Sequence, residues 1–436
     1  MRRIIFPVLA VSVLAWAGAL WLRPPAVFNV WTWRDQLILL TGLAAYVLMA
    51  LIMLLSVRPM WLERRLDGLD KMYRLHKWCG ILATALAAAH YLIKLGKPLM
   101  LAMFDPVPKT PRAAAMLDVF RGSAKDLGEW AVWILVAMVV LTLWHRFPYH
   151  IWRQVHRIAA VIFLVAAFHG VVLTPDAWWW QPAGWLIGVA TAVGTVCALM
   201  ALTGRIGRAR RYKGTVLQVE HLSDDILRVT CHVQGDWHHR AGQFAFLTAH
   251  RKEGAHPFTV SGADDGSGKV QFSIKALGDY TRRLQKTLAV GQAVTVEGPY
   301  GCFDFRRDDG RAQVWVGAGI GVTPFVSWLE ALQAKPAAAP NATLYYCARN
   351  AADAPFADRL RELCARVPNV KLDVRYSDEQ RPLTAAELAQ ARQADGPWPS
   401  VWFCGPAGFA DALKDGLHQR GMPVRQLFHQ EAFQMR

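Results

Sequence analysis

The sequence predicts a multi-domain membrane protein, in which a six-helix transmembrane bundle precedes an antiparallel β-barrel and a doubly wound α/β domain. Long apolar runs stop near residue 204, short alternating segments follow, and strands then alternate with helices. The 436-residue chain is 53% hydrophobic but 19% charged, which fits a membrane region and soluble domains on one chain. We expect boundaries at 1–204 for the bundle, 205–213 for a basic linker, 214–311 for the barrel and 312–436 for the α/β domain.

Six apolar runs predict the transmembrane bundle. A helix rises 1.5 Å per residue, so roughly 20 apolar residues cross a hydrocarbon layer of about 30 Å. The first run follows Arg2 and Arg3 and also resembles a secretory signal, whose removal would leave five spans without inverting the others. The runs lie at about 4–22, 36–57, 76–95, 130–144, 155–174 and 183–203.

Basic residues in the connections indicate the orientation. Lys and Arg gather in alternate connections, and the positive-inside rule assigns these, with everything after residue 204, to the cytoplasm. Trp178, Trp179 and Trp180 fit an aromatic belt at the opposite face. The net charge of +16 is then partly explained by a membrane-facing collar that attracts anionic lipid, a simpler explanation than nucleic-acid binding. We expect a multi-pass protein of a bacterial-type inner (plasma) membrane with cytoplasmic soluble domains.

Four histidines inside the apolar runs form two matched pairs. His76 and His90 are 14 residues apart, and His156 and His169 are 13 apart, so each spacing covers about 20 Å of helix. A buried histidine is costly in a membrane, and neutral imidazole is an axial ligand of haem iron. The pattern predicts two haems, one held by His76 and His156 towards the cytoplasm and one held by His90 and His169 towards the outside.

Other potential ligands show weaker patterns. A single histidine in an apolar helix is more often a hydrogen-bonded core residue than a ligand, and we interpret His145 and His150 in this way or as interfacial groups. The seven cysteines show neither a C-x-x-C motif nor a zinc spacing.

Two segments of the predicted barrel suggest a dinucleotide site. The turn His256-Pro257-Phe258-Thr259 can present an aromatic ring and a hydroxyl to a flat ligand, although a plain surface turn is the simpler reading of these four residues alone. Lys275 is followed by Gly278 and by a helix starting near Thr281, so a cation and free backbone N–H groups can converge on a diphosphate. The expected strands are Gly214–Val219, Ile226–Val233, Gln243–Thr248 and Val270–Ile274.

A glycine-rich loop opens the predicted α/β domain. Gly317, Gly319 and Gly321 follow an apolar strand, and a helix begins after Thr323 and Pro324. Glycines allow close approach of phosphate to the backbone, and a helix N-terminus favours negative charge. The loop is not G-x-G-x-x-G, and a structural turn is the alternative. The expected strands are Gln313–Val316, Thr343–Cys347, Lys371–Tyr376 and Val401–Cys404, with further helices near Phe356–Val367 and Phe409–Arg420.

In this order and spacing, the motifs resemble those of the NADPH oxidase and ferric reductase superfamily over roughly residues 36–436. The resemblance implies a two-haem membrane domain joined to a ferredoxin-reductase-like module. It assigns His256–Thr259 to the flavin, Lys275 to the basic position before the Gly-Asp-aromatic-Thr motif, and Gly317–Phe325 to the nicotinamide nucleotide. Cys404, Gly405 and Pro406 match the element near the nicotinamide, and Phe433 matches the aromatic that covers the flavin. Gln434, Met435 and Arg436 follow this aromatic, which departs from oxidases of the family.

The resemblance implies a transmembrane oxidoreductase with FAD, NADPH or NADH, and two haem b groups. Electrons would pass from NAD(P)H through FAD and haem to an outer acceptor, with Phe433 and Cys404 at the site of hydride transfer. Oxygen giving superoxide is the preferred acceptor, and a ferric chelate or a periplasmic partner is the alternative. A haem-binding sensor or transporter is less favoured. Arg349 is the candidate for a 2′-phosphate of NADPH, ahead of Arg375 and Arg381.

Overall fold

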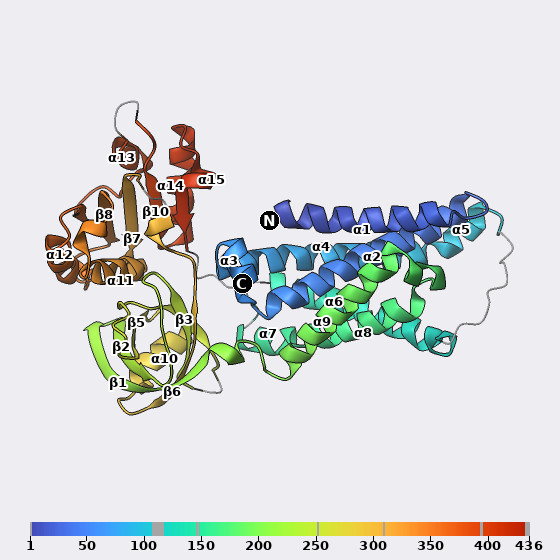
Figure 1. The fold of residues 1–436 in the computed structure, drawn as a ribbon, viewed down its shortest axis with the longest axis horizontal. Coiled ribbons are helices and arrows are strands. Elements are labelled where there is room, and N and C mark those ends of the chain that lie inside the picture. Colours follow the sequence, from blue (N-terminus) through green and yellow to red (C-terminus); the bar gives the residue numbers. More distant parts are fainter. Residues whose placement is uncertain are drawn as a thin grey trace. The chain divides into compact units, whose positions relative to one another are not determined.

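The structure is a computed structural model that describes residues 2–106, 117–144, 147, 149–250, 253–307, 310–392 and 396–431. The chain divides into two compact units. A membrane unit contains the residues up to Leu66 and Lys71–Ile206, and a nucleotide unit contains Asp67–Asp70 and the residues from Gly207 onward. Figure 1 shows the helices of the first unit and the two sheets of the second.

Within the described residues, the membrane unit has six helical segments long and apolar enough to cross a membrane. The predicted six-helix bundle is therefore confirmed. Three segments begin well before the predicted apolar runs, at Val30, Leu69 and Asp118 instead of at about 36, 76 and 130, because each helix continues into polar residues. Asn29 and Thr32, for example, form a reciprocal capping box at the start of one of them. The helices are α1 (Arg2–Leu22), α2 (Val30–Ser56), α3 (Met60–Leu66), α4 (Leu69–Leu95), α5 (Lys97–Met103), α6 (Arg121–Leu143), α7 (Tyr149–His156), α8 (Ile158–Leu173) and α9 (Pro182–Leu202).

Close helix packing forms the core of the membrane unit. Helix α9 packs against α2 and α8, and α6 packs against α8. The rings of Tyr46 on α2 and Phe163 on α8 stack with their centroids 5.7 Å apart. Gly194 of α9 lies against the Phe163 ring, where a Cβ atom would collide. Small residues let membrane helices approach each other in this way.

The first sheet of the nucleotide unit is antiparallel throughout and has the strand order β4-β3-β6-β1-β2-β5. Between the two edge strands, β4 and β5, there is only one isolated bridge, from Val260 to Phe272. Among the described residues, the barrel is therefore not fully closed. Strand β1 begins at Arg211, inside the predicted linker, because Arg211–Thr215 pairs with Ala293–Glu297. The elements are β1 (Arg211–Ser223), β2 (Ile226–Val233), β3 (Phe244–Thr248), β4 (His256–Thr259), β5 (Lys269–Lys275), α10 (Asp279–Thr287) and β6 (Ala293–Tyr300).

The second sheet is parallel, with the order β11-β10-β7-β8-β9, and confirms the predicted doubly wound domain. The chain continues from β7 to β8 and β9 on one side and returns to β10 on the other, so the winding direction reverses between β7 and β10. The elements are β7 (Gln313–Ala318), α11 (Thr323–Leu332), β8 (Ala342–Ala348), α12 (Ala357–Ala365), β9 (Val370–Tyr376), α13 (Ala385–Gln390), β10 (Ser400–Cys404), α14 (Ala407–Gln419), α15 (Val424–Leu427) and β11 (Phe428–Gln430).

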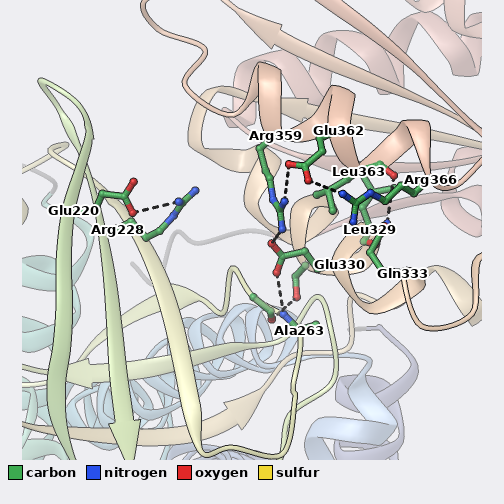
Figure 2. A network of polar contacts seen from close by, with 12 residues as sticks. Glu220, Arg228, Ala263, Leu329, Glu330, Gln333, Arg359, Glu362, Leu363 and Arg366 are labelled. Atoms are coloured by element: carbon green, nitrogen blue, oxygen red, sulfur yellow. Dashed lines mark hydrogen bonds and ion pairs between the residues drawn. The ribbon is translucent and has the colours of Figure 1, made fainter.

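Helix α11 connects this sheet to the barrel (Figure 2). The carboxylate of Glu330 accepts hydrogen bonds from Arg359 of α12 at 3.0 Å and from the backbone N–H of Ala263 at 3.3 Å. The Ser327 hydroxyl donates to the carbonyl of Gly262 at 2.9 Å. Polar contacts on both sides therefore hold α11, the helix that follows the glycine-rich loop.

Candidate functional site

The structure brings the four membrane histidines together in the two pairs named from the sequence. The ring centroids of His76 on α4 and His156 on α7 lie 6.0 Å apart. Those of His90 on α4 and His169 on α8 lie 6.1 Å apart. Two metal–nitrogen bonds of about 2 Å each, plus the distance from each nitrogen to its ring centre, give roughly 6 Å. Both pairs therefore have a spacing at which two imidazoles could hold one metal ion.

Hydrogen bonds orient the His90 and His169 rings for such a role. Nδ1 of His90 lies 2.9 Å from the carbonyl oxygen of Ile38, and Nδ1 of His169 lies 2.8 Å from that of Ala124. A carbonyl can only accept, so each Nδ1 carries the hydrogen and each Nε2 keeps its lone pair. Metal-binding histidines commonly have such a partner on the second nitrogen. This pair fits the proposed haem iron in spacing and in tautomer.

The His76–His156 pair has a different environment. Nδ1 of His156 is buried and has no hydrogen-bond partner among the described residues. The Trp152 ring stacks on the His156 ring with centroids 4.9 Å apart. Spacing supports a metal between these two rings, while the second nitrogen of His156 lacks the carbonyl that both rings of the other pair have.

A polar cluster next to His90 on α4 was not predicted from the sequence. Glu129 of α6 accepts a hydrogen bond from the Tyr91 hydroxyl and pairs with the ammonium of Lys94 at 2.9 Å. Ionisable residues within membrane helices usually have a function. The sequence feature that could have indicated this cluster is the position of Glu129, directly before the predicted apolar run 130–144.

The predicted flavin-binding residues lie on β4, at the end of β5 and at the start of α10. The rings of His256 and Tyr280 stack with centroids 3.7 Å apart and an interplanar angle of 12°. Burial raises the pKa of Tyr280 to about 12, so its hydroxyl stays neutral. Pro257 and Phe258 are half-buried and Thr259 is buried. The aromatic face suited to a flat ligand therefore includes Tyr280, which the sequence motif contains but does not single out.

Local contacts already engage two of the residues expected at a diphosphate. The Lys275 ammonium pairs with Asp225 at 3.1 Å. The Thr281 hydroxyl accepts hydrogen bonds from the backbone N–H groups of Leu277 and Gly278 at 2.9 and 3.0 Å. Thr281 therefore stabilises the start of α10, and the anion-binding potential there comes from the backbone of the first helical turn.

The glycine-rich loop runs from β7 through the short 3-10 turn η5 (Gly319–Val322) into α11. Each of its three glycines is required for a different structural reason. A Cβ on Gly317 would meet the Val322 backbone at 2.8 Å, and one on Gly321 would collide with the Cys404 carbonyl. Gly319 has a φ of +56°, which favours glycine, and open space around it. The loop can therefore present bare backbone to a phosphate, and Thr323 and Pro324 begin the helix behind it.

The loop and the Cys-Gly-Pro element meet at the reversal point of the parallel sheet. Cys404, the last residue of β10, is in register with Gly317 of β7. Ligands of doubly wound sheets bind at this kind of crevice, outside the carboxyl ends of the strands. Gly405 packs against Ala318, and Pro406 leads into α14. Burial raises the pKa of the Cys404 thiol well above its ordinary range, so the thiol is neutral.

The three candidate arginines differ in how firmly they are engaged. The Arg349 side chain is 73% exposed and pairs only loosely with Asp353, at 3.5 Å. The Arg375 side chain is 24% exposed and is held by Asp373 and Glu387 at 2.9 and 3.1 Å. Arg349 is thus freer than Arg375 to meet a phosphate, and Arg381 is exposed. Phe433 lies outside the described residues.

Three families match successive parts of the chain. The family described as "Ferric reductase like transmembrane component" matches residues 41–167. "FAD-binding domain" matches residues 211–303, and "Oxidoreductase NAD-binding domain" matches residues 315–415. A membrane module and a flavin and nicotinamide module are therefore joined on one chain.

Individual relatives match parts of the chain. It is 27% identical over 206 residues to respiratory burst oxidase homolog protein E of Arabidopsis thaliana, covering 41% of this chain and 21% of the relative. It is 25% identical over 228 residues to the propane 2-monooxygenase reductase component of Rhodococcus jostii, covering 49% and 61%. Amycolatopsis cytochrome P450 reductase superposes with a TM-score of 0.45 and 25% identity over 51% of this chain and 70% of that chain. The chain spans less than two thirds of either curated relative.

Proposed function

The chain belongs to the NADPH oxidase and ferric reductase superfamily, and from this premise we propose that it carries electrons from cytoplasmic NAD(P)H through FAD and two b-type haems to an acceptor at the outer face of the membrane. The proposed acceptor is oxygen, which gains one electron and becomes superoxide. The main support for this proposal is that four histidines form two pairs, at two positions along α4. The same chain matches FAD-binding and NAD-binding domains.

The residues of the chain bind and orient the reactants. When bound, FAD supplies the exchange between a two-electron hydride and single electrons, and haem iron carries single electrons. His76 with His156, and His90 with His169, would each hold one haem. The stretch His256–Thr259, with Lys275 and the start of α10, would hold the flavin nucleotide.

The nicotinamide nucleotide would lie at the reversal point of the parallel sheet. Gly317, Gly319 and Gly321 would face its phosphates through the main chain, and Cys404 would contact the nicotinamide ring. Because that thiol is neutral, it does not compete as a nucleophile for the ring. Phe433 would cover the flavin from the C-terminal segment and move aside when nicotinamide arrives.

NADPH is the preferred donor in this proposal. A guanidinium pairs well with a phosphate dianion, and Arg349 follows β8 near the edge where an adenosine ribose would lie. The exposure of its side chain and its long contact with Asp353 leave it able to turn towards such a group.

The orientation also belongs to the proposal. Arg205, Arg208 and Arg210 lie between α9 and β1, and the positive-inside rule favours the cytoplasm for such a basic connection. The nucleotide unit follows this connection, so we assign it to the cytoplasm, where NAD(P)H is available.

Ferric-chelate reduction is the second candidate. The match of residues 41–167 to the ferric-reductase-like component favours it. The same electron route would serve a ferric chelate that docks at the outer face and takes one electron.

The test separates the two acceptors. NADPH is added to purified, FAD-supplemented protein, and cytochrome c reduction is followed with and without superoxide dismutase, with ferric-chelate reduction measured anaerobically in parallel. Strong suppression by the dismutase supports oxygen as the acceptor. Undiminished cytochrome c reduction with rapid anaerobic ferric reduction supports a metal or protein acceptor. If neither cytochrome c nor the ferric chelate is reduced, the proposed function is contradicted.

A further inference from the structure

We infer that Gly42 and Gly128 are positioning residues for the His90–His169 pair, each exposing a backbone carbonyl that orients one imidazole. The inference rests on the proposed role of these histidines as haem ligands. It concerns two helices, α2 and α6, that carry none of the four histidines.

Helix α2 provides the first contact. The carbonyl of Ile38 lies 2.9 Å from Nδ1 of His90. Gly42 is four residues further along the same helix, and a Cβ atom there would lie 3.0 Å from Nδ1 and 3.1 Å from Cε1 of His90. The imidazole therefore occupies the space that a side chain at position 42 would need.

Helix α6 repeats the arrangement for the other ring. The carbonyl of Ala124 lies 2.8 Å from Nδ1 of His169. Gly128 is again four residues further along, and a Cβ atom there would collide with the His169 ring. The same four-residue relation between carbonyl and glycine thus occurs on two separate helices, once for each ring of the pair.

Helix geometry explains the spacing of four. The carbonyl of residue i accepts the N–H of residue i+4 and keeps a second lone pair. Each Cα–Cβ bond tilts towards the helix N-terminus, so a side chain at i+4 leans over the carbonyl of residue i. Glycine at i+4 removes this cover, and a second donor, here an imidazole N–H, can reach the carbonyl.

The arrangement affects the ligand as well as its position. Donation of the Nδ1 hydrogen to a carbonyl makes Nε2 a stronger electron donor and fixes the ring orientation. A stronger donor favours oxidised iron, so the two carbonyls would lower the reduction potential of a haem held by His90 and His169. In the other pair, His76 has a hydrogen bond with the backbone of Ile52, while Nδ1 of His156 has no hydrogen-bond partner among the described residues.

Helical glycines without such a neighbour provide matched controls. A Cβ on Gly122, in the first turn of α6, would meet nothing within 4 Å, and the same holds for Gly80 on α4. Because alanine stabilises a helix relative to glycine, Gly122→Ala should be tolerated and should leave both histidine pairs unchanged.

The experiment compares Gly42→Ala, Gly128→Ala and Gly122→Ala in the full-length protein. Haem content per chain, a potentiometric titration of each haem and the low-temperature electron paramagnetic resonance spectrum are measured. Gly128→Ala should lose one of two haems. Gly42→Ala, with the milder contact, should keep both, raise one midpoint potential and change one set of g-values. Gly122→Ala should match the parent in all three.

The outcomes separate this inference from the proposed function. A parent protein that binds no haem contradicts both. A parent with two haems, together with a Gly42→Ala protein whose potentials and spectrum are unchanged, contradicts only the positioning role. If Gly128→Ala fails to fold, Gly42→Ala decides the question.

Discussion

The candidate site of the membrane unit is made of side chains, whereas the glycine-rich loop of the nucleotide unit offers mainly backbone. In the membrane unit, four side chains meet in two pairs, with ring centroids 6.0 and 6.1 Å apart. In the nucleotide unit, the glycine-rich loop presents bare backbone, and a Cβ at Gly321 would collide with the Cys404 carbonyl. The histidine site should therefore lose its function when a side chain is removed, and the glycine-rich loop should lose its function when a side chain is added.

The largest expected effect is the removal of a membrane histidine. His169→Ala should reduce the haem content from two per chain to one, because a single imidazole then remains at that position. Electron transfer from NADPH to the acceptor should stop, while NADPH still reduces the flavin. Haem quantification and anaerobic flavin spectra check this, with His221→Ala on β1 as the control. Retention of both haems would contradict the side-chain half of the comparison.

Addition of a methyl group at Gly321 should give the next largest effect. Overpacking against a backbone carbonyl costs about 1–3 kcal/mol, which corresponds to roughly a 5- to 150-fold rise in the KM for NADPH if the strain falls on binding. Dithionite should still reduce both haems, because the membrane unit is unchanged. The matched control is Gly408→Ala on α14, where a Cβ has open space. Equal KM values for the two variants would show that the loop is not the nucleotide site.

Arg349→Ala tests a side-chain contact within the backbone-built site. Loss of a charge-assisted hydrogen bond of about 1.5–3 kcal/mol predicts a rise of at least roughly tenfold in the KM for NADPH. The KM for NADH should not change, because NADH lacks the 2′-phosphate. Steady-state kinetics with both donors measure this, and Arg361→Ala on α12 is the control. A parallel change with both donors would exclude Arg349 as the 2′-phosphate contact.

The smallest effect concerns the Cys404 thiol. Burial raises its pKa in the folded protein, so it remains protonated when the unfolded thiol ionises above about pH 8.5. Ionisation then favours the unfolded chain, and this thiol's contribution to stability falls as the pH rises through that range. At pH 8, iodoacetamide should label the partly exposed Cys302 before Cys404, as read by mass spectrometry. Rapid labelling of native Cys404 would show an accessible thiolate.

The fold class and the histidine pairs could be predicted because they depend on local periodicity. Apolar runs of membrane length gave the six spans, and strands alternating with helices gave the parallel sheet. The spacing from His76 to His90 is a property of one helix, α4. His156 and His169 were expected on one helix, but they lie on α7 and α8, which the structure separates at Arg157. The two pairs still form because α7 and α8 follow each other directly within one apolar span. No tertiary information was needed for these steps.

The parts that escaped prediction depend on contacts between distant segments. The carbonyls of Ile38 and Ala124 approach the imidazoles from other helices, and a backbone atom leaves no mark on the residue type. The three-residue strand β11 exists by pairing with β10, and three residues are too few for a periodic pattern. Likewise, Lys275 appeared in the sequence as a cation open to phosphate, while Asp225 lies 3.1 Å from its ammonium.

In the proposed function, electrons from NADPH reach two haems, each held by two histidines. The most direct measurement is the anaerobic addition of NADPH to purified, FAD-supplemented protein, followed by optical spectra of the haem bands and by haem quantification. We expect two low-spin haems per chain, which NADPH reduces to the same extent as dithionite does. Protein that reduces its flavin while its haems stay oxidised, or that contains no haem, would contradict it.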